Sequence, residues 1–134
     1  MWQRLSSREC TSPFAVEQGK EPFPEKELIQ TPKDREATDV AIDCSDCMPC
    51  FSACPMAWTD QKYAGPAGFV IAARFIADTR DSARLERLAK VGCEDGVWRC
   101  HTVFNCPEAC PKSIDLPHFI QYIKRRATSA AIKR

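Results

Sequence analysis

The sequence predicts an all-α domain, in which helices alternate with two cysteine-rich loops, preceded by an extended and irregular N-terminal arm. No stretch alternates apolar and polar residues in the way of a half-buried strand. Several stretches instead repeat their apolar residues with a helical period, and two short cysteine runs, each ending in Cys-Pro, separate these stretches. We therefore divide the 134 residues into an arm, residues 1–30, and a helical domain, residues 31–134.

The composition narrows the classes of function that remain. The chain has 19 Lys and Arg against 18 Asp and Glu, a net charge of +1, so it lacks the basic excess that would predict a nucleic-acid partner. It has no apolar run long enough to cross a bilayer. Of its nine cysteines, seven lie in the two runs. The other two, Cys10 and Cys93, are expected to be ordinary side chains in a reducing compartment.

The N-terminal arm shows no clear period. Its first residues place arginines among apolar side chains, faintly like a mitochondrial targeting segment, although Glu9 and the short length argue against one. The proline-rich residues 19–26 are typical of an extended linker. We treat the whole arm as a candidate interface or targeting segment. At its end, Thr31 can cap a helix that has Pro32 at its first position and Asp34 three residues after the cap. A helix of about ten residues is expected there.

The first cysteine run, CSDCMPCFSACP, begins where that helix ends. Its four cysteines and the proline that follows them are Cys44, Cys47, Cys50, Cys54 and Pro55. This is the spacing of bacterial ferredoxins, in which three cysteines on a tight loop bind one 4Fe–4S cube. In two-cluster proteins the fourth cysteine ligates the other cluster, so a partner run is expected. The run predicts a helical ferredoxin-like domain.

The second run, CHTVFNCPEACP, is a near copy of the first. Cys100, Cys106 and Cys110 match the first, third and fourth cysteines, whereas Val103, which cannot ligate iron, stands at the second position. If the fourth cysteines are exchanged between clusters, a 4Fe–4S cluster is held by Cys44, Cys47, Cys50 and Cys110. Three thiolates then remain for the second site, which suits a 3Fe–4S cluster: Cys54, Cys100 and Cys106.

Two alternatives compete with iron–sulfur clusters. Four-cysteine zinc sites are usually built from paired C-x2-C segments, which fit this pattern poorly. Disulfides between neighbouring cysteines of one short loop would be strained, and the sequence shows no secretory signal.

The residues between the two runs predict two helices. Before them, Trp58 and Tyr63 lie in a short glycine-rich segment, where they either pack on the cluster loops or form the wall of a ligand site. The first helix is expected over residues 66–77. Its apolar face comprises Phe69, Val70, Ala73, Ile76 and Ala77. The second is expected to be capped by Ser82 and to stop at Gly92. Its expected inward residues are Leu85, Leu88 and Ala89, and its expected outward ones Arg84, Glu86 and Arg87.

A last helix is expected to begin at Pro117. Its apolar residues Phe119, Ile120 and Ile123 share one face. The basic cluster Lys124, Arg125 and Arg126 suits the C-terminal end of a helix, where positive charges interact favourably with the negative end of the helix dipole. We interpret this cluster as solvated.

Five segments in order resemble the C-terminal half of the succinate dehydrogenase iron–sulfur subunit: CSDCMPCFSACP, KYAGPAG, ARFIADTRD, RLAK and RCHTVFNCPEACPK. The resemblance covers about residues 36–126, and the interval between the runs matches as well. It implies the same two ligand sets, with the 3Fe–4S cluster next to a ubiquinone pocket. The positions that it assigns to this pocket are Pro55, Trp58 and His101.

The resemblance implies an electron-transfer subunit of succinate:ubiquinone oxidoreductase, peripheral on the matrix side of the mitochondrial inner membrane. Its expected partners are a flavoprotein subunit, membrane-anchor subunits and ubiquinone, and no complete active site is expected on this chain. The family's usual N-terminal domain binds a 2Fe–2S cluster, but residues 1–43 contain only one cysteine. A separate 2Fe–2S chain is therefore expected, as in the split subunits of euglenozoan mitochondria. The alternatives are a fumarate reductase or a heterodisulfide-reductase-like or glycolate-oxidase-like module, against which His101 and Val103 argue.

Overall fold

The computed structural model describes residues 27–60 and 62–132. Most of the expected arm, including Cys10, lies outside these residues. The described part of the chain is helical and contains no strand, which confirms the predicted fold class. None of its helices has both the length and the apolar character that spanning a membrane requires.

The predicted first helix, α2, spans Pro32–Ile42. Thr31 is its N-cap, and the Thr31 side-chain oxygen accepts a hydrogen bond from the backbone N–H of Asp34 at 3.2 Å. This bond satisfies one of the donors that the first helical turn leaves unpaired, as predicted. The helix ends at Ile42, two residues before Cys44, and so delivers the chain to the first cysteine run.

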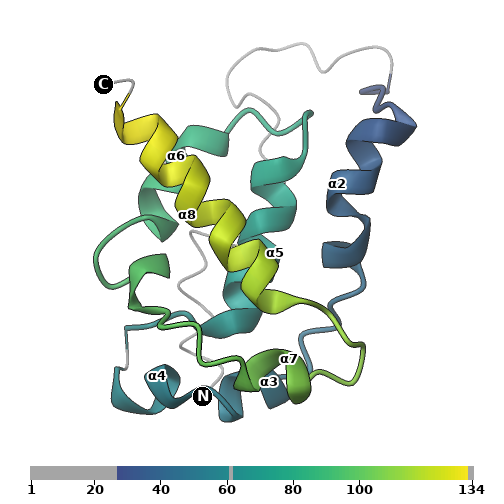
Figure 1. Cartoon of the computed structure of the whole chain (residues 1–134). Coiled ribbons are helices and arrows are strands. Elements are labelled where there is room, and N and C mark those ends of the chain that lie inside the picture. Colours follow the sequence, from purple (N-terminus) through teal and green to yellow (C-terminus); the bar gives the residue numbers. More distant parts are fainter. Residues whose placement is uncertain (1–26, 61, 133–134) are drawn as a thin grey trace.

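The core lies between four helices (Figure 1). Helix α5, Gly65–Ala77, packs against α8, Leu116–Ile132, against α2, and against α6, Arg84–Val91; α6 also packs against α8. The largest fully buried side chains of this core include Phe69, Val70, Ile76, Ile120 and Ile123. The predicted faces of the α5 and α8 helices are therefore confirmed, except that Ala77 is only half-buried.

Three short helices form one end of the molecule (Figure 1): α3, Pro49–Ser52, α4, Pro55–Thr59, and α7, Asn105–Glu108. Helices α3 and α7 belong to the two cysteine runs and lie side by side. Asn105 Nδ2 donates a hydrogen bond to the backbone oxygen of Ala53 at 3.4 Å and so joins the two runs directly. A 3-10 turn, η1, Val97–Arg99, leads into the second run.

The predicted faces of α6 were wrong at three positions. Leu85 is 71% exposed and Ala89 is exposed, whereas Arg87 is buried at 2% exposure. The reason lies outside the helix: the Arg87 Nε donates to Oδ2 of the buried Asp81 at 2.8 Å. The Arg87 guanidinium also lies 4.7 Å from the ring centroid of Phe75.

The ends of α6 agree with the prediction only in part. The helix begins after Ala83 rather than at a Ser82 cap, and the Asp81 carboxylate accepts a hydrogen bond from the backbone N–H of Ala83 at 2.8 Å. Gly92 follows the last helical residue, as predicted.

The basic cluster of α8 was placed wrongly by the sequence. The helix begins at Leu116 and continues to Ile132, so residues 124–126 lie in its middle and not at its C-terminal end. Lys124 is not simply solvated, because its Nζ donates to the backbone oxygen of Cys100 at 2.9 Å. It also lies 5.9 Å from the ring centroid of Trp98, within reach of a cation–π contact.

Candidate metal centres

The two cysteine loops have the same unusual backbone. Asp46 and Met48 have φ angles of 56° and 74°, and the matching residues of the second run, Thr102 and Phe104, have φ angles of 57° and 65°. Positive φ is costly for residues other than glycine, and such strain concentrates at functional sites. Turns in which residues with positive φ alternate with residues with negative φ make concave nests of backbone N–H groups. Such nests often bind anionic groups such as iron–sulfur clusters.

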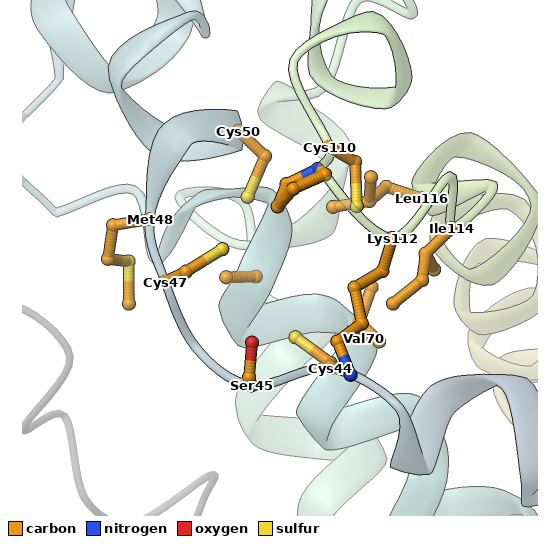
Figure 2. Close-up of a pocket in the computed structure, with 12 residues that line it drawn as sticks. Cys44, Ser45, Cys47, Met48, Cys50, Val70, Cys110, Lys112, Ile114 and Leu116 are labelled. Carbon is orange, nitrogen blue, oxygen red and sulfur yellow. The ribbon is translucent and has the colours of Figure 1, made fainter.

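The first loop surrounds a hollow that also receives one cysteine from the second run. Cys44, Cys47, Cys50 and Cys110 all line it, and their sulfur atoms point into the same space (Figure 2). The hollow has a volume of about 360 Å³, including space open to solvent. Its apolar wall includes Val70 of α5.

A second hollow of the same volume is lined by two cysteines of the second run and one of the first. Cys100 and Cys106 line it together with Cys54 from the first run, and Val103 lies where the first hollow has Cys47. The structure therefore brings together the same two sets of cysteines that the sequence predicted as ligands. In the described residues, no three His, Cys, Asp or Glu side chains meet closely enough to share one metal ion.

The electrostatics of the cysteines follow from their burial and mutual proximity. Burial, and after it the charges of neighbouring cysteines such as Cys44 and Cys106, raise the pKa of Cys50 to about 12. Burial, and after it the charge of Cys100, raise the pKa of Cys106 to about 11. Several thiolates can share such a space only beside a cationic centre, because burial and mutual repulsion both disfavour them. The all-sulfur donor set fits iron–sulfur clusters.

Two buried polar atoms near the hollows have no hydrogen-bond partner: the hydroxyl oxygen of Tyr63 and Oδ1 of Asp46. Tyr63 is 1% exposed and lines the second hollow. Asp46 lies in the first loop, and burial raises its pKa. The sequence left the role of Tyr63 open. Asp46 was not predicted as a site residue, although its position between Cys44 and Cys47 was a signal.

The three residues expected at a quinone pocket are placed differently. Pro55 and His101 line the second hollow. Trp58 does not, and its side chain is 71% exposed on α4. Two further apolar residues are exposed beside this hollow, Val103 at 53% and Phe104 at 55%.

Comparison with known proteins connects this geometry to a family. Residues 37–111 match the 4Fe-4S dicluster domain. The fumarate reductase iron–sulfur subunit of Mycobacterium tuberculosis is 34% identical over 122 residues, which are 91% of this chain and 49% of the relative. The mitochondrial succinate dehydrogenase [ubiquinone] iron–sulfur subunit 1 of Oryza sativa subsp. japonica is 38% identical over 114 residues, 84% of this chain and 41% of the relative.

A third relative, the succinate dehydrogenase iron–sulfur subunit of Coxiella burnetii, is 39% identical over 102 residues, 75% of this chain and 43% of the relative. The chain thus spans at most about half the length of these relatives.

Proposed function

The chain belongs to the 4Fe-4S dicluster domain family, and we propose that it is an electron-transfer subunit. The complex to which we assign it is succinate:ubiquinone oxidoreductase, respiratory complex II. The observation that carries the proposal is the pair of hollows, each lined by cysteines from both runs. The similarity to succinate dehydrogenase iron–sulfur subunits supports the same conclusion.

The ligand sets follow from the two linings. Cys44, Cys47, Cys50 and Cys110 hold a 4Fe–4S cluster, and three cysteines hold a 3Fe–4S cluster: Cys54, Cys100 and Cys106. When bound, the clusters supply one-electron acceptance and donation. Val103 offers no thiolate at the fourth corner of the second site.

The chain keeps the two sites close together through its short helices. Cys50 of the first hollow lies in α3, and Cys54 of the second follows it after about one helical turn. In the same way, Cys106 of the second hollow lies in α7, and Cys110 of the first follows it. Because α3 and α7 pack side by side, both sites share one rigid base. This arrangement suits a relay in which electrons pass from one site to the next without leaving the protein.

Electrons leave, in this proposal, through ubiquinone bound beside the second hollow, at Pro55, Trp58 and His101. Quinone reduction needs protons as well as electrons. The imidazole of His101, which is exposed at the hollow, can donate from one nitrogen while accepting at the other. The exposed Trp58 indole offers an apolar wall and one N–H donor. Membrane-anchor subunits cover this face and place the chain peripherally on the matrix side of the mitochondrial inner membrane.

Electrons enter from partners that this chain lacks. We propose a flavoprotein subunit that oxidises succinate and a separate ferredoxin-domain chain that carries a 2Fe–2S cluster, so that the chain works as a subunit without a complete active site. About half or more of each of these relatives lies outside the part that this chain matches. Near the N-terminal end of the described part, Leu28, Ile29 and Val40 are exposed apolar residues that a partner chain could cover.

Mass spectrometry of the native complex tests the proposal. We expect a flavoprotein, a 2Fe–2S ferredoxin-domain chain and membrane anchors to co-purify with this chain. A monomer that carries both clusters and co-purifies with none of them would contradict it. Two further observations distinguish an iron–sulfur protein from a structural zinc protein. An iron–sulfur protein contains iron and is brown, whereas a zinc protein contains zinc and is colourless.

A fumarate reductase is the second candidate, supported by the similarity to the mycobacterial subunit. Activity of the purified complex in both directions, succinate oxidation and fumarate reduction, distinguishes the two. A heterodisulfide-reductase-like module is less well supported, because its second run normally has four cysteines.

A further inference from the structure

The hydroxyl group of Tyr63 is buried at the second hollow without a partner. Tyr63 is 1% exposed, and its ring packs on Phe69 with the centroids 5.4 Å apart. By distance and angle the hydroxyl oxygen makes no hydrogen bond among the described residues, although the Cys100 side chain lies close enough to interact with it. Buried tyrosine hydroxyls usually find a hydrogen-bond partner, because burial removes the hydrogen bonds that water would make.

The surroundings of this hydroxyl group point to its missing partner. The pKa of Tyr63 is raised, first because burial disfavours the phenolate, then by the charges of Cys100 and Cys54, and then by a hydrogen-bonding contact with the Cys100 side chain, with a smaller contribution from the charge of Cys106. These are the three cysteines of the second hollow, which Tyr63 itself lines. The buried phenol O–H is therefore a donor in a residue that lines the same hollow as three possible sulfur acceptors.

We propose that Tyr63 donates a hydrogen bond from its hydroxyl group to the sulfur of Cys100 when the second cluster is bound, and that this bond raises the reduction potential of that cluster. The inference rests on the proposed function, since it needs a cluster at Cys54, Cys100 and Cys106. Gaining an electron adds negative charge to the cluster and its sulfur ligands. A donor at a sulfur therefore stabilises the reduced state more than the oxidised one.

The test is a redox titration, followed by EPR, of the complex purified with Tyr63→Phe. The substitution keeps the ring and its contact with Phe69 and removes only the donor. We expect the equilibrium constant for reduction of the second cluster to fall about tenfold, which is ~59 mV for a one-electron couple. The potential of the first cluster should not change. The matched control is Tyr122→Phe on α8, whose ring lies 5.2 Å from the Arg126 guanidinium and does not line either hollow.

A second measurement detects the donated proton itself, first in the unsubstituted complex and then in the two variants. Electron–nuclear double resonance of the oxidised second cluster in the unsubstituted complex, in H2O and in D2O, should detect an exchangeable proton that Tyr63→Phe removes and Tyr122→Phe keeps. An unchanged potential in Tyr63→Phe with the cluster present, or the same exchangeable protons in both complexes, would overturn this inference alone. The absence of any cluster at the second hollow in the unsubstituted complex would instead overturn the proposed function, and this inference with it.

Discussion

Arg87 and Asp81 form an ion pair inside the protein, with Arg87 Nε 2.8 Å from Asp81 Oδ2 and side chains that are 2% and 0% exposed. The pair connects α6 to the turn that follows α5, and Asp81 also accepts a hydrogen bond from the backbone N–H of Ala83. Ionised groups are rarely buried unless they are paired, because removing each from water is expensive. The position of α6 therefore depends on one contact between charged groups as well as on apolar packing.

Replacing Arg87 with Met should destabilise the chain by about 3–5 kcal/mol, because it leaves the Asp81 carboxylate buried without its partner. Adding Asp81→Leu to that variant should restore part of the loss. Urea unfolding measures both. The control is Arg35→Met, which removes an exposed ion pair with Asp39 and should cost less than about 1 kcal/mol. Equal losses in the two single variants would show that burial does not govern the Arg87 pair.

Gly65→Ala should destabilise the chain by about 1–3 kcal/mol, a typical cost of overpacking or of a positive φ outside glycine. Gly65 has φ +82°, and an added Cβ would clash with Cδ2 of the buried Phe51 ring. The matched control is Gly68→Ala in the same helix, whose Cβ would meet only the Cβ of Ala64 at 3.4 Å. Thermal unfolding, with iron content as a second readout, should show a clear loss for Gly65→Ala and almost none for Gly68→Ala.

Val103→Cys should convert the second cluster from 3Fe–4S toward 4Fe–4S. Val103 holds the position that Cys47 holds in the first run, and it lines the second hollow. The added thiolate brings negative charge, so the potential of the second cluster should fall. EPR of the oxidised complex should lose the 3Fe–4S signal, whereas the control Val103→Ala should keep it. A spectrum that Val103→Cys leaves unchanged would refute the proposed exchange of ligands between the two runs.

Trp58→Leu should lower reduction of ubiquinone by succinate at least about tenfold, the effect of losing roughly 1.4 kcal/mol of binding or transition-state stabilisation. Both clusters should still assemble and be reduced by succinate. The control is Leu85→Ala, which changes an equally exposed apolar side chain, 71% in each case, on α6. Unchanged ubiquinone reduction in Trp58→Leu with intact clusters would remove Trp58 from the quinone site.

The sequence predicted the features that depend on neighbouring residues. The cap of α2 follows from Thr31, Pro32 and Asp34, which lie within one turn of each other. The grouping of the cysteines into two sets followed from their spacing, and the same sets line the two hollows. Spacing was informative here because a short loop of fixed geometry leaves its cysteines few directions in which to point.

Features that depend on distant residues could not be predicted in this way. The helical period placed Arg87 outward, because nothing in α6 indicates that Asp81 is buried beside it. The sequence placed Lys124 at a helix end. In the structure its Nζ donates to the backbone oxygen of Cys100, 24 residues earlier in the chain.

The sequence by itself therefore determined the helical class and the two sets of cysteines, because local periodicity and short loops define both. The tertiary structure was needed to show that Tyr63 lies buried at the second hollow, whereas Trp58, which does not line that hollow, is exposed. Both are aromatic residues of one short segment, and their burial depends on which side chains from α5 and the second run pack around them. The energy of that packing belongs to contacts between residues far apart in the chain, which no local pattern records.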